Sequence, residues 1–286
     1  MRQKYFDQSL GIRQLNSISC QLKLTCESSM QNQAYKQILF RTNRRKQMIP
    51  HILYQLSRIF GDGPLTNRDC RQITDSCSSL SFSDQMRVWT RLICLQPILK
   101  AITQYIPTTP GRIIDLGSGY GVLSWLLASS RKQEILGIEV SLPRLAIAQQ
   151  ITKDIQNLTF EHGDIANIAV EPSSTILLID VLCLFPIGTQ QRILFSCADS
   201  LTNNGILLLK DNTTIPKWKF HYASLEERVK LFLGIYSIPT LEQPNYLSPD
   251  TWRNLITRSN LKIRDEFLVK SLAPYPGIIY ICQKSS

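Results

Sequence analysis

Features of secreted and membrane-bound proteins are missing from this chain. No run approaches the roughly 18 consecutive apolar residues that a membrane-spanning helix requires. The first eight residues also lack the apolar core of a signal peptide. We therefore expect a cytoplasmic protein with no transmembrane segment.

Paired cysteines are absent as well. The eight cysteines lie at positions 20, 26, 70, 77, 94, 183, 197 and 282, with no C-x-x-C pair among them. Such pairs are typical of zinc sites, and dense, regular spacing is typical of disulfide frameworks. The scattered positions favour reduced thiols, and we expect no bound metal.

Acidic residues are scarce in the first third of the chain. Residues 1–100 contain 15 Lys and Arg against 6 Asp and Glu, whereas residues 101–286 contain 17 against 16. This uneven charge predicts a basic, partly helical extension over residues 1–80 and a second domain over residues 81–286. Within the extension we expect partial disorder in residues 1–34, and a linker over residues 61–80.

The basic residues are densest at 41–46, directly before an amphipathic run at residues 49–60. Such a cluster can contact RNA, an acidic protein or, through residues 41–60, the surface of an anionic membrane. It can also be the solvated face of a helix that packs against the rest of the protein. We favour this last interpretation, because the cluster is short and has no interleaved aromatic residues for base stacking.

A glycine-rich turn is the most informative feature that is present. An apolar strand ends at Asp115 and Leu116, and Gly117, Gly119 and Gly121 follow before an apolar helix. Glycine allows both the tight turn and the close approach of a ligand to the backbone. The dinucleotide fingerprint G-x-G-x-x-G requires its third glycine one position later, where this chain has Val122.

Asp115 also argues against a dinucleotide, because its carboxylate repels a pyrophosphate but suits a ligand with an amine and a sulfonium. With Asp115 and the three glycines, the segment resembles the first motif of the class I S-adenosylmethionine-dependent methyltransferases. This resemblance implies S-adenosylmethionine as the cofactor. It also implies a Rossmann-like, seven-stranded mixed sheet, parallel except for an antiparallel last strand and flanked by helices.

The chain after the turn follows the expected alternation of strands and helices. A helix follows Ser141, and another begins after Pro186. A further helix is expected upstream, capped by Ser83 or Asp84, and residues 202–205 are expected to form a turn. The strands after the glycine turn are expected at residues 134–139, 158–162, 175–180, 205–210, 261–267 and 277–282.

Acidic residues at the strand ends complete the predicted cofactor site. Glu139 comes 22 residues after Gly117, near the interval at which an acid binds ribose hydroxyls. The resemblance implies that Asp164 holds the adenine amino group, and Asp180 ends the fourth strand. The predicted cofactor-binding residues are Asp115, Gly117, Ser118, Gly119, Gly121, Glu139, Asp164, Ile165 and Asp180.

Residues 210–222 collect titratable and aromatic groups after the fifth strand and predict a lid over the acceptor substrate. Asp211 and His221 are candidates for the general base, although His221 can equally be a surface histidine. Three aromatic side chains, Trp218, Phe220 and Tyr222, could form the wall of the acceptor site.

The acceptor is predicted partly from missing motifs. The chain after Asp180 reads Val-Leu-Cys-Leu, without the Asn/Asp-Pro-Pro-Tyr/Phe motif of enzymes that methylate planar amino groups and without a Pro-Cys nucleophile. We therefore expect methyl transfer to a small-molecule or lipid-like acceptor, at oxygen. An RNA methyltransferase that uses the basic extension, or a cofactor-binding subunit without catalysis, is the alternative.

Overall fold

The computed structural model describes residues 48–232, 244–269 and 274–284. The chain divides between residues 49 and 50, and the described residues after this point form one compact unit. The boundary predicted at residue 80 lies inside this unit. The predicted disorder of residues 1–34 and the basic cluster at 41–46 lie outside the described residues. No described helix is both long enough and apolar enough to cross a bilayer.

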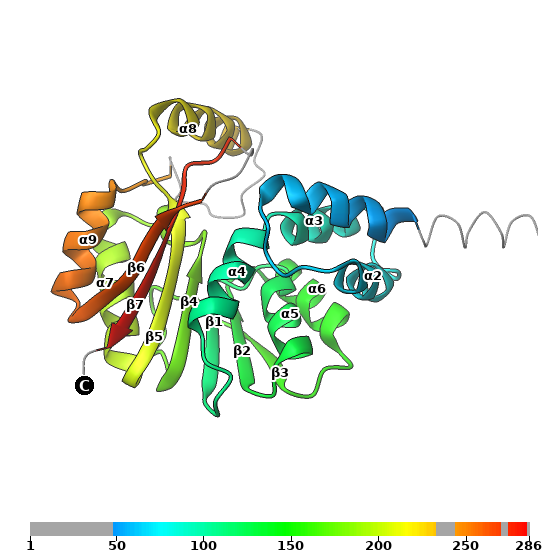
Figure 1. Cartoon of the computed structure of the whole chain (residues 1–286), viewed down its shortest axis with the longest axis horizontal. Helices are drawn as coiled ribbons and strands as arrows, with labels where there is room; N and C mark the ends of the chain where they lie inside the picture. Colours follow the sequence, from blue (N-terminus) through cyan, green and yellow to red (C-terminus); the bar gives the residue numbers. More distant parts are fainter. Residues whose placement is uncertain (1–47, 233–243, 270–273, 285–286) are drawn as a thin grey trace, which may run out of the picture. The chain divides into compact units, whose positions relative to one another are not determined.

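The described strands form a single seven-stranded mixed sheet in the order β3-β2-β1-β4-β5-β7-β6 (Figure 1). Strands β1 to β5 are parallel, and β7 is antiparallel to both of its neighbours. This topology confirms the predicted fold. The strands are β1 Arg112–Leu116, β2 Glu134–Glu139, β3 Leu158–His162, β4 Ser173–Ile179, β5 Leu201–Asn212, β6 Leu261–Leu268 and β7 Gly277–Lys284.

The helices of the described chain occupy the connections between strands and the region before β1. Residues 48–60 are helical. The other helices are α2 Asn67–Ser76, α3 Phe82–Ile93, α4 Gln96–Tyr105, α5 Val122–Ser130, α6 Leu142–Thr152, the short 3-10 helix Leu182–Leu184, α7 Ile187–Ser200, α8 Lys217–Phe232 and α9 Pro249–Arg258.

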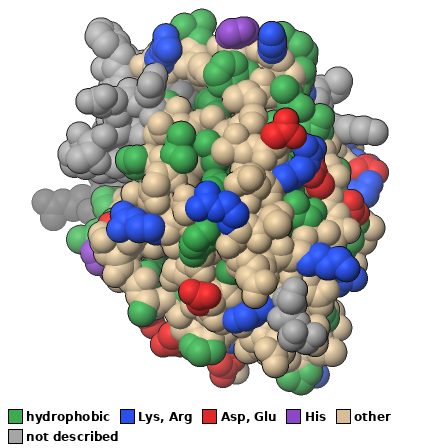
Figure 2. All heavy atoms as spheres, turned by 90° about the vertical axis from the view of Figure 1, so that its left-hand side faces the viewer, with side chains coloured by type: hydrophobic (Ala, Val, Ile, Leu, Met, Phe, Trp, Pro, Cys, Tyr) green, Lys and Arg blue, Asp and Glu red, His purple; other side chains and the backbone are tan. Residues whose placement is uncertain are grey.

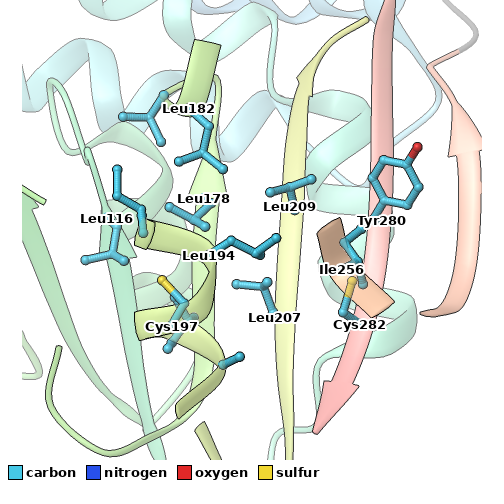
Figure 3. Packing of buried hydrophobic residues seen from close by; sticks show 14 of the residues in the cluster. Leu116, Leu178, Leu182, Leu194, Cys197, Leu207, Leu209, Ile256, Tyr280 and Cys282 are labelled. Carbon is cyan, nitrogen blue, oxygen red and sulfur yellow. The ribbon is translucent and has the colours of Figure 1, made fainter. Parts of the chain in front are cut away.

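Helices α7 and α9 cover one face of the sheet. Leu194 and Cys197 of α7 and Ile256 of α9 pack there on Leu207 and Leu209 of β5 (Figure 3). On the other side, α5 and α6 pack against β2 and β3, and α3 packs on α5. Burial of apolar side chains on both faces of the parallel strands explains their nearly continuous apolar sequences.

Three local predictions were wrong. The expected linker at 61–80 contains α2, where Thr66 and Asp69 form a reciprocal capping box. Helix α3 is capped by Ser81, two residues before the earlier of the two predicted caps. The expected turn at 202–205 lies within β5, because a register irregularity opposite Ser173 and Thr175 accommodates these polar residues without ending the strand.

The sheet places the predicted functional residues at the carboxyl ends of its parallel strands. The strand order reverses between β1 and β4, and open α/β sheets bind ligands in the crevice at the carboxyl ends of such strands. In Figure 1, α8 lies above this edge. Figure 2 shows the side formed by α9 and β6, where acidic and basic side chains alternate and Arg253 pairs with Asp250 and Glu266.

Candidate active site

The three glycines of the turn have left-handed backbone conformations, with φ values of +75° at Gly117, +60° at Gly119 and +70° at Gly121. A Cβ on Gly117 would lie 2.6 Å from Val181 Cγ2, and one on Gly121 would lie 2.6 Å from Phe160 Cζ. A Cβ on Gly119 would meet no atom within 4 Å. Packing therefore requires the outer glycines, whereas Gly119 faces open space that a ligand can fill.

Asp115 is buried on β1, where its Oδ2 accepts a hydrogen bond of 2.6 Å from the Ser124 hydroxyl. Burial raises the pKa of this carboxyl to about 6, although Ser124 and the positive charge of Arg91 oppose the shift. A cation beside such a carboxylate would stabilise its ionised form. An amine or a sulfonium in the crevice would supply that charge.

Glu139 links the end of β2 to the glycine turn. Its buried carboxylate accepts the backbone N–H of Gly119 at 2.8 Å and that of Ser141 at 2.8 Å. An ionised carboxylate has about four acceptor positions, so these bonds leave capacity for ligand hydroxyls. Glu139 is therefore held rigidly next to Gly119, in the position expected of a ribose ligand.

The other predicted cofactor residues differ in exposure. Asp164 is half-buried and accepts hydrogen bonds from the backbone two residues on and from Asn167, in a turn after β3. Ile165 is buried in the apolar core. The hydroxyl of Ser118 is buried beside Gly137 of β2 and has no hydrogen-bond partner in the described part of the chain.

Asp180 follows β4 directly and joins two basic side chains. It has a left-handed backbone, with φ of 57°. Its Oδ2 accepts a hydrogen bond of 2.8 Å from Arg91 of α3, and its Oδ1 accepts one from Lys210 of β5. Burial opposes ionisation, but Lys210 and Arg91 together hold the pKa of Asp180 below its ordinary value. Asp180 is therefore ionised and paired.

A cavity of about 310 Å³ opens beside this network. Its walls come from the helices before β1, from α6, and from the ends of β4, β5 and β7. They combine apolar or aromatic side chains with a few polar groups. The lining residues are Phe60, Arg91, Cys94, Pro97, Ile98, Arg144, Asp180, Cys183, Leu184, Lys210, Asn212, Pro244, Tyr246, Val269, Tyr275 and Gly277.

The two candidate bases lie outside this lining. Asp211 is buried, and its oxygens accept the backbone N–H groups of Cys183 at 2.8 Å and Asn212 at 2.7 Å. Burial and the nearby charge of Asp180 raise the pKa of Asp211 to about 6. His221 is exposed on α8. The structure thus places neither side chain on the cavity wall, and the catalytic role of each stays a prediction.

The predicted lid at residues 210–222 begins with the last three residues of β5 and ends in the first six residues of helix α8. The Phe220 ring contacts Tyr246 at a centroid distance of 6.0 Å, and the Tyr222 ring contacts Tyr275 at 6.3 Å. Tyr246 and Tyr275 both line the cavity. Phe220 and Tyr222, two of the three predicted wall residues, therefore contact residues of the cavity wall but do not line the cavity themselves. The third, Trp218, has 62% of its surface exposed.

Sequence reasoning missed the basic side chains of the cavity. Arg91, Arg144 and Lys210 come from α3, α6 and β5. Lys210 could have been found from its position at the end of a strand, like Asp180. Arg91 and Arg144 carry no such signal, because the tertiary packing of α3 and α6 decides which of their side chains face the cavity.

Comparisons with known proteins agree with this geometry. Residues 109–252 match the family described as a methyltransferase domain. The carboxy-S-adenosyl-L-methionine synthase of Helicobacter pylori is 33% identical over 99 residues, which are 34% of this chain and 41% of that protein. This chain therefore spans about two fifths of the length of the curated relatives that it matches.

Solved structures share the fold at low sequence identity. An S-adenosylmethionine-dependent methyltransferase from Methanosarcina mazei has a TM-score of 0.52 at 17% identity, over 65% of this chain and 97% of its own. Magnesium protoporphyrin IX methyltransferase from Synechocystis, solved with bound S-adenosylhomocysteine, has a TM-score of 0.50 at 18% identity, over 80% and 91%.

The family match at residues 109–252 covers just over half of the chain, and it defines the class of protein. The chain belongs to the methyltransferase domain family, and it shares the class I fold of solved S-adenosylmethionine-dependent methyltransferases. S-adenosylmethionine stays the cofactor that the first motif predicts, and the Synechocystis structure that shares this fold holds S-adenosylhomocysteine. The open space over Gly119, the adjoining Glu139 and the buried Asp115 are a donor set that fits a ribose and a cationic amino-acid end.

Proposed function

We propose that this enzyme methylates a small-molecule or lipid-like acceptor, at oxygen. The observation that supports this proposal is the size of the cavity, about 310 Å³, together with its largely apolar and aromatic wall. A pocket of this kind encloses a small ligand. The acceptor would enter beneath α8, whose aromatic side chains contact two residues of the cavity wall.

We propose that the predicted cofactor residues hold the donor at the carboxyl ends of β1 to β4. Glu139 would accept hydrogen bonds from the ribose hydroxyls, and Asp164 would accept from the adenine amino group. Gly119 leaves room for the ligand at the backbone. When bound, the donor supplies an activated methyl group on a sulfonium. The protein aligns the acceptor, excludes water and, where the acceptor is a hydroxyl, removes its proton.

Two measurements test this function. Calorimetric titration should detect binding of S-adenosylhomocysteine, and incubation with methyl-labelled S-adenosylmethionine and fractionated extract of the source organism should label a small-molecule or lipid fraction. Label that enters only RNA would contradict the proposed acceptor and favour the RNA methyltransferase. Binding without transfer to any fraction would favour a non-catalytic subunit. The cytoplasmic location stays a prediction.

A further inference from the structure

The polar part of the cavity wall is unusually rich in positive charge. Arg91, Arg144 and Lys210 line it, whereas Asp180 is the only carboxylate among the described lining residues. Among these described lining residues, three cations against one anion leave a net charge of two positive units. A neutral or cationic acceptor would gain nothing from this arrangement, but an acid would be attracted to it.

These cations keep donors available for a ligand. Within the described residues, the Arg91 guanidinium makes one hydrogen bond, to Asp180, and the Lys210 ammonium also makes one, to Asp180. Arg144 lies over the ring of Tyr120, at 5.7 Å from the centroid. Since a guanidinium has five N–H donors and an ammonium three, most of these donors remain unused.

Neighbouring carboxylates do not cancel this charge at the wall. Asp115 and Asp211 are buried behind it, and their oxygens accept hydrogen bonds from Ser124 and from backbone N–H groups. Neither residue lines the cavity. Their pKa values of about 6 also mean that each carries its full charge only well above that pH.

The same described part of the wall offers few groups that could act as a base. No histidine or glutamate is among the described lining residues, and Asp180 is paired with two cations. Burial raises the pKa of the Cys183 thiol, and burial together with Glu226 raises the pKa of Tyr275. An alcohol needs a base to remove its proton during methyl transfer, but a carboxylate is already ionised at neutral pH.

We propose that the acceptor is a carboxylic acid, that Arg144, Arg91 and Lys210 bind its carboxylate, and that the enzyme forms a methyl ester. This inference rests on the proposed function and names its substrate class. One carboxylate oxygen can accept from a guanidinium while the other attacks the methyl carbon. The new C–O bond forms as the C–S bond breaks, and the sulfur keeps the electron pair of that bond. The sulfonium charge and the carboxylate charge disappear together, and no proton is released.

The chemistry of the product provides the test. Methyl esters release methanol in mild alkali, whereas methyl ethers and methylamines do not. Extract labelled by the full-length enzyme and methyl-labelled S-adenosylmethionine should therefore release volatile label in alkali. Prior capping of carboxylates in the extract, with a carbodiimide and methylamine, should remove the acceptor. Alkali-stable label would overturn the proposed ester, and absence of label in every fraction would instead contradict the proposed function.

Substitutions connect the ester to the cavity. Arg144→Gln should lower the alkali-labile label about tenfold or more, because one charged contact to the acceptor is lost. Binding of S-adenosylhomocysteine, measured by calorimetry, should not change and also reports folding. Arg144→Lys should retain more activity than Arg144→Gln. Arg192→Gln, on the exposed surface of α7, is the matched control and should behave like wild type.

One outcome would reassign the cations. If Arg144→Gln weakens S-adenosylhomocysteine binding as much as it lowers labelling, the cations hold the carboxylate of the cofactor, and the proposal fails. Equal labelling by wild type and Arg144→Gln would also overturn it.

Discussion

Gly119 and Gly121 have nearly the same backbone conformation but different surroundings. At Gly121 a Cβ would collide with Phe160 and with Ala148, at 2.6 and 2.8 Å. At Gly119 it would meet nothing within 4 Å. Gly121 therefore serves packing between α5, α6 and β3, whereas Gly119 faces the open space that we assign to the cofactor. Substitution separates these two roles.

Gly119→Ala should cost about 1 kcal/mol of unfolding free energy, because alanine is strained at positive φ. It should weaken binding of S-adenosylhomocysteine by more than tenfold, since the added methyl group fills ligand space. Gly121→Ala should cost more than about 2 kcal/mol, because strain and collision add. Urea denaturation and calorimetry measure both quantities. Unchanged ligand binding by Gly119→Ala would contradict the assignment of this space to the cofactor.

Asp115 destabilises the unliganded fold at neutral pH. Its folded-state pKa of about 6 exceeds the ordinary value of 3.8, so the folded protein holds this proton more tightly than the unfolded chain. The resulting stabilisation is complete below pH 4 and is lost as the pH rises through 6. An asparagine resembles the protonated form at every pH.

Asp115→Asn should therefore raise the unfolding free energy of the unliganded protein at pH 8 by up to about 3 kcal/mol. The gain should shrink toward zero at pH 4, and urea denaturation across this pH range measures it. Asp199→Asn, at an exposed position of α7, is the matched control substitution. A constant difference between Asp115→Asn and wild type from pH 4 to pH 8 would contradict the raised pKa.

At the level of single residues, the sequence was sufficient to propose the site residues whose positions depend on local chain geometry. Asp115, the glycines and Glu139 follow from strand ends and a tight turn. Side-chain direction along β5 was harder to predict. Side chains alternate along a strand, so Lys210 and Asn212 line the cavity, whereas Asp211 does not and accepts a hydrogen bond from the backbone N–H of Cys183. The sequence grouped residues 210–212 in one predicted segment. Their different surroundings follow from the alternation of side chains between the two faces of the strand.

Among the elements, helix α8 is joined to the cavity wall by aromatic contacts and by one hydrogen bond. Its Phe220 and Tyr222 contact aromatic residues of the cavity wall, and the Tyr275 hydroxyl donates a hydrogen bond of 3.1 Å to Glu226 Oε1. The sequence predicted a lid here because aromatic and titratable groups follow a strand end. The sequence did not predict that the lid reaches the cavity through Tyr246 and Tyr275.

Tyr275→Phe should loosen α8 without unfolding the protein. The substitution keeps the ring contact with Tyr222 but removes the hydrogen bond to Glu226, worth about 1 kcal/mol. Amide hydrogen exchange in α8 should become about fivefold faster, while exchange in the central strands stays unchanged. Tyr222→Phe is the matched control, because it keeps the same ring pair and the hydrogen bond of Tyr275. Equal exchange rates in wild type and Tyr275→Phe would contradict this tether.

For the molecule as a whole, the alternation of strands and helices was predictable because buried parallel strands have continuous apolar sequences. The sheet order was predictable only through the family resemblance, since strand pairing is a long-range property. Helix α2 was missed because its only buried residues are Cys70 and Ile73, and polar residues dominate the remainder. Its capping box, Thr66 and Asp69, was the local signal that could have revealed it.

Cofactor binding should stabilise the whole compact unit, because its ligands come from the ends of β1, β2 and β4 and from the turn after β3. S-adenosylhomocysteine at one hundred times its Kd should add about 2.7 kcal/mol to the unfolding free energy. This corresponds to a rise of roughly 5–10 °C in Tm for a domain of this size.

NAD at the same concentration should leave Tm unchanged, because Val122 replaces the third glycine of the dinucleotide fingerprint and Asp115 repels a pyrophosphate. A Tm shift with NAD as large as that with S-adenosylhomocysteine would contradict the selectivity assigned to the glycine turn. Differential scanning calorimetry of wild type and Gly119→Ala makes the comparison. At the same concentration of S-adenosylhomocysteine, the shift in the variant should fall to about half or less of the wild-type shift.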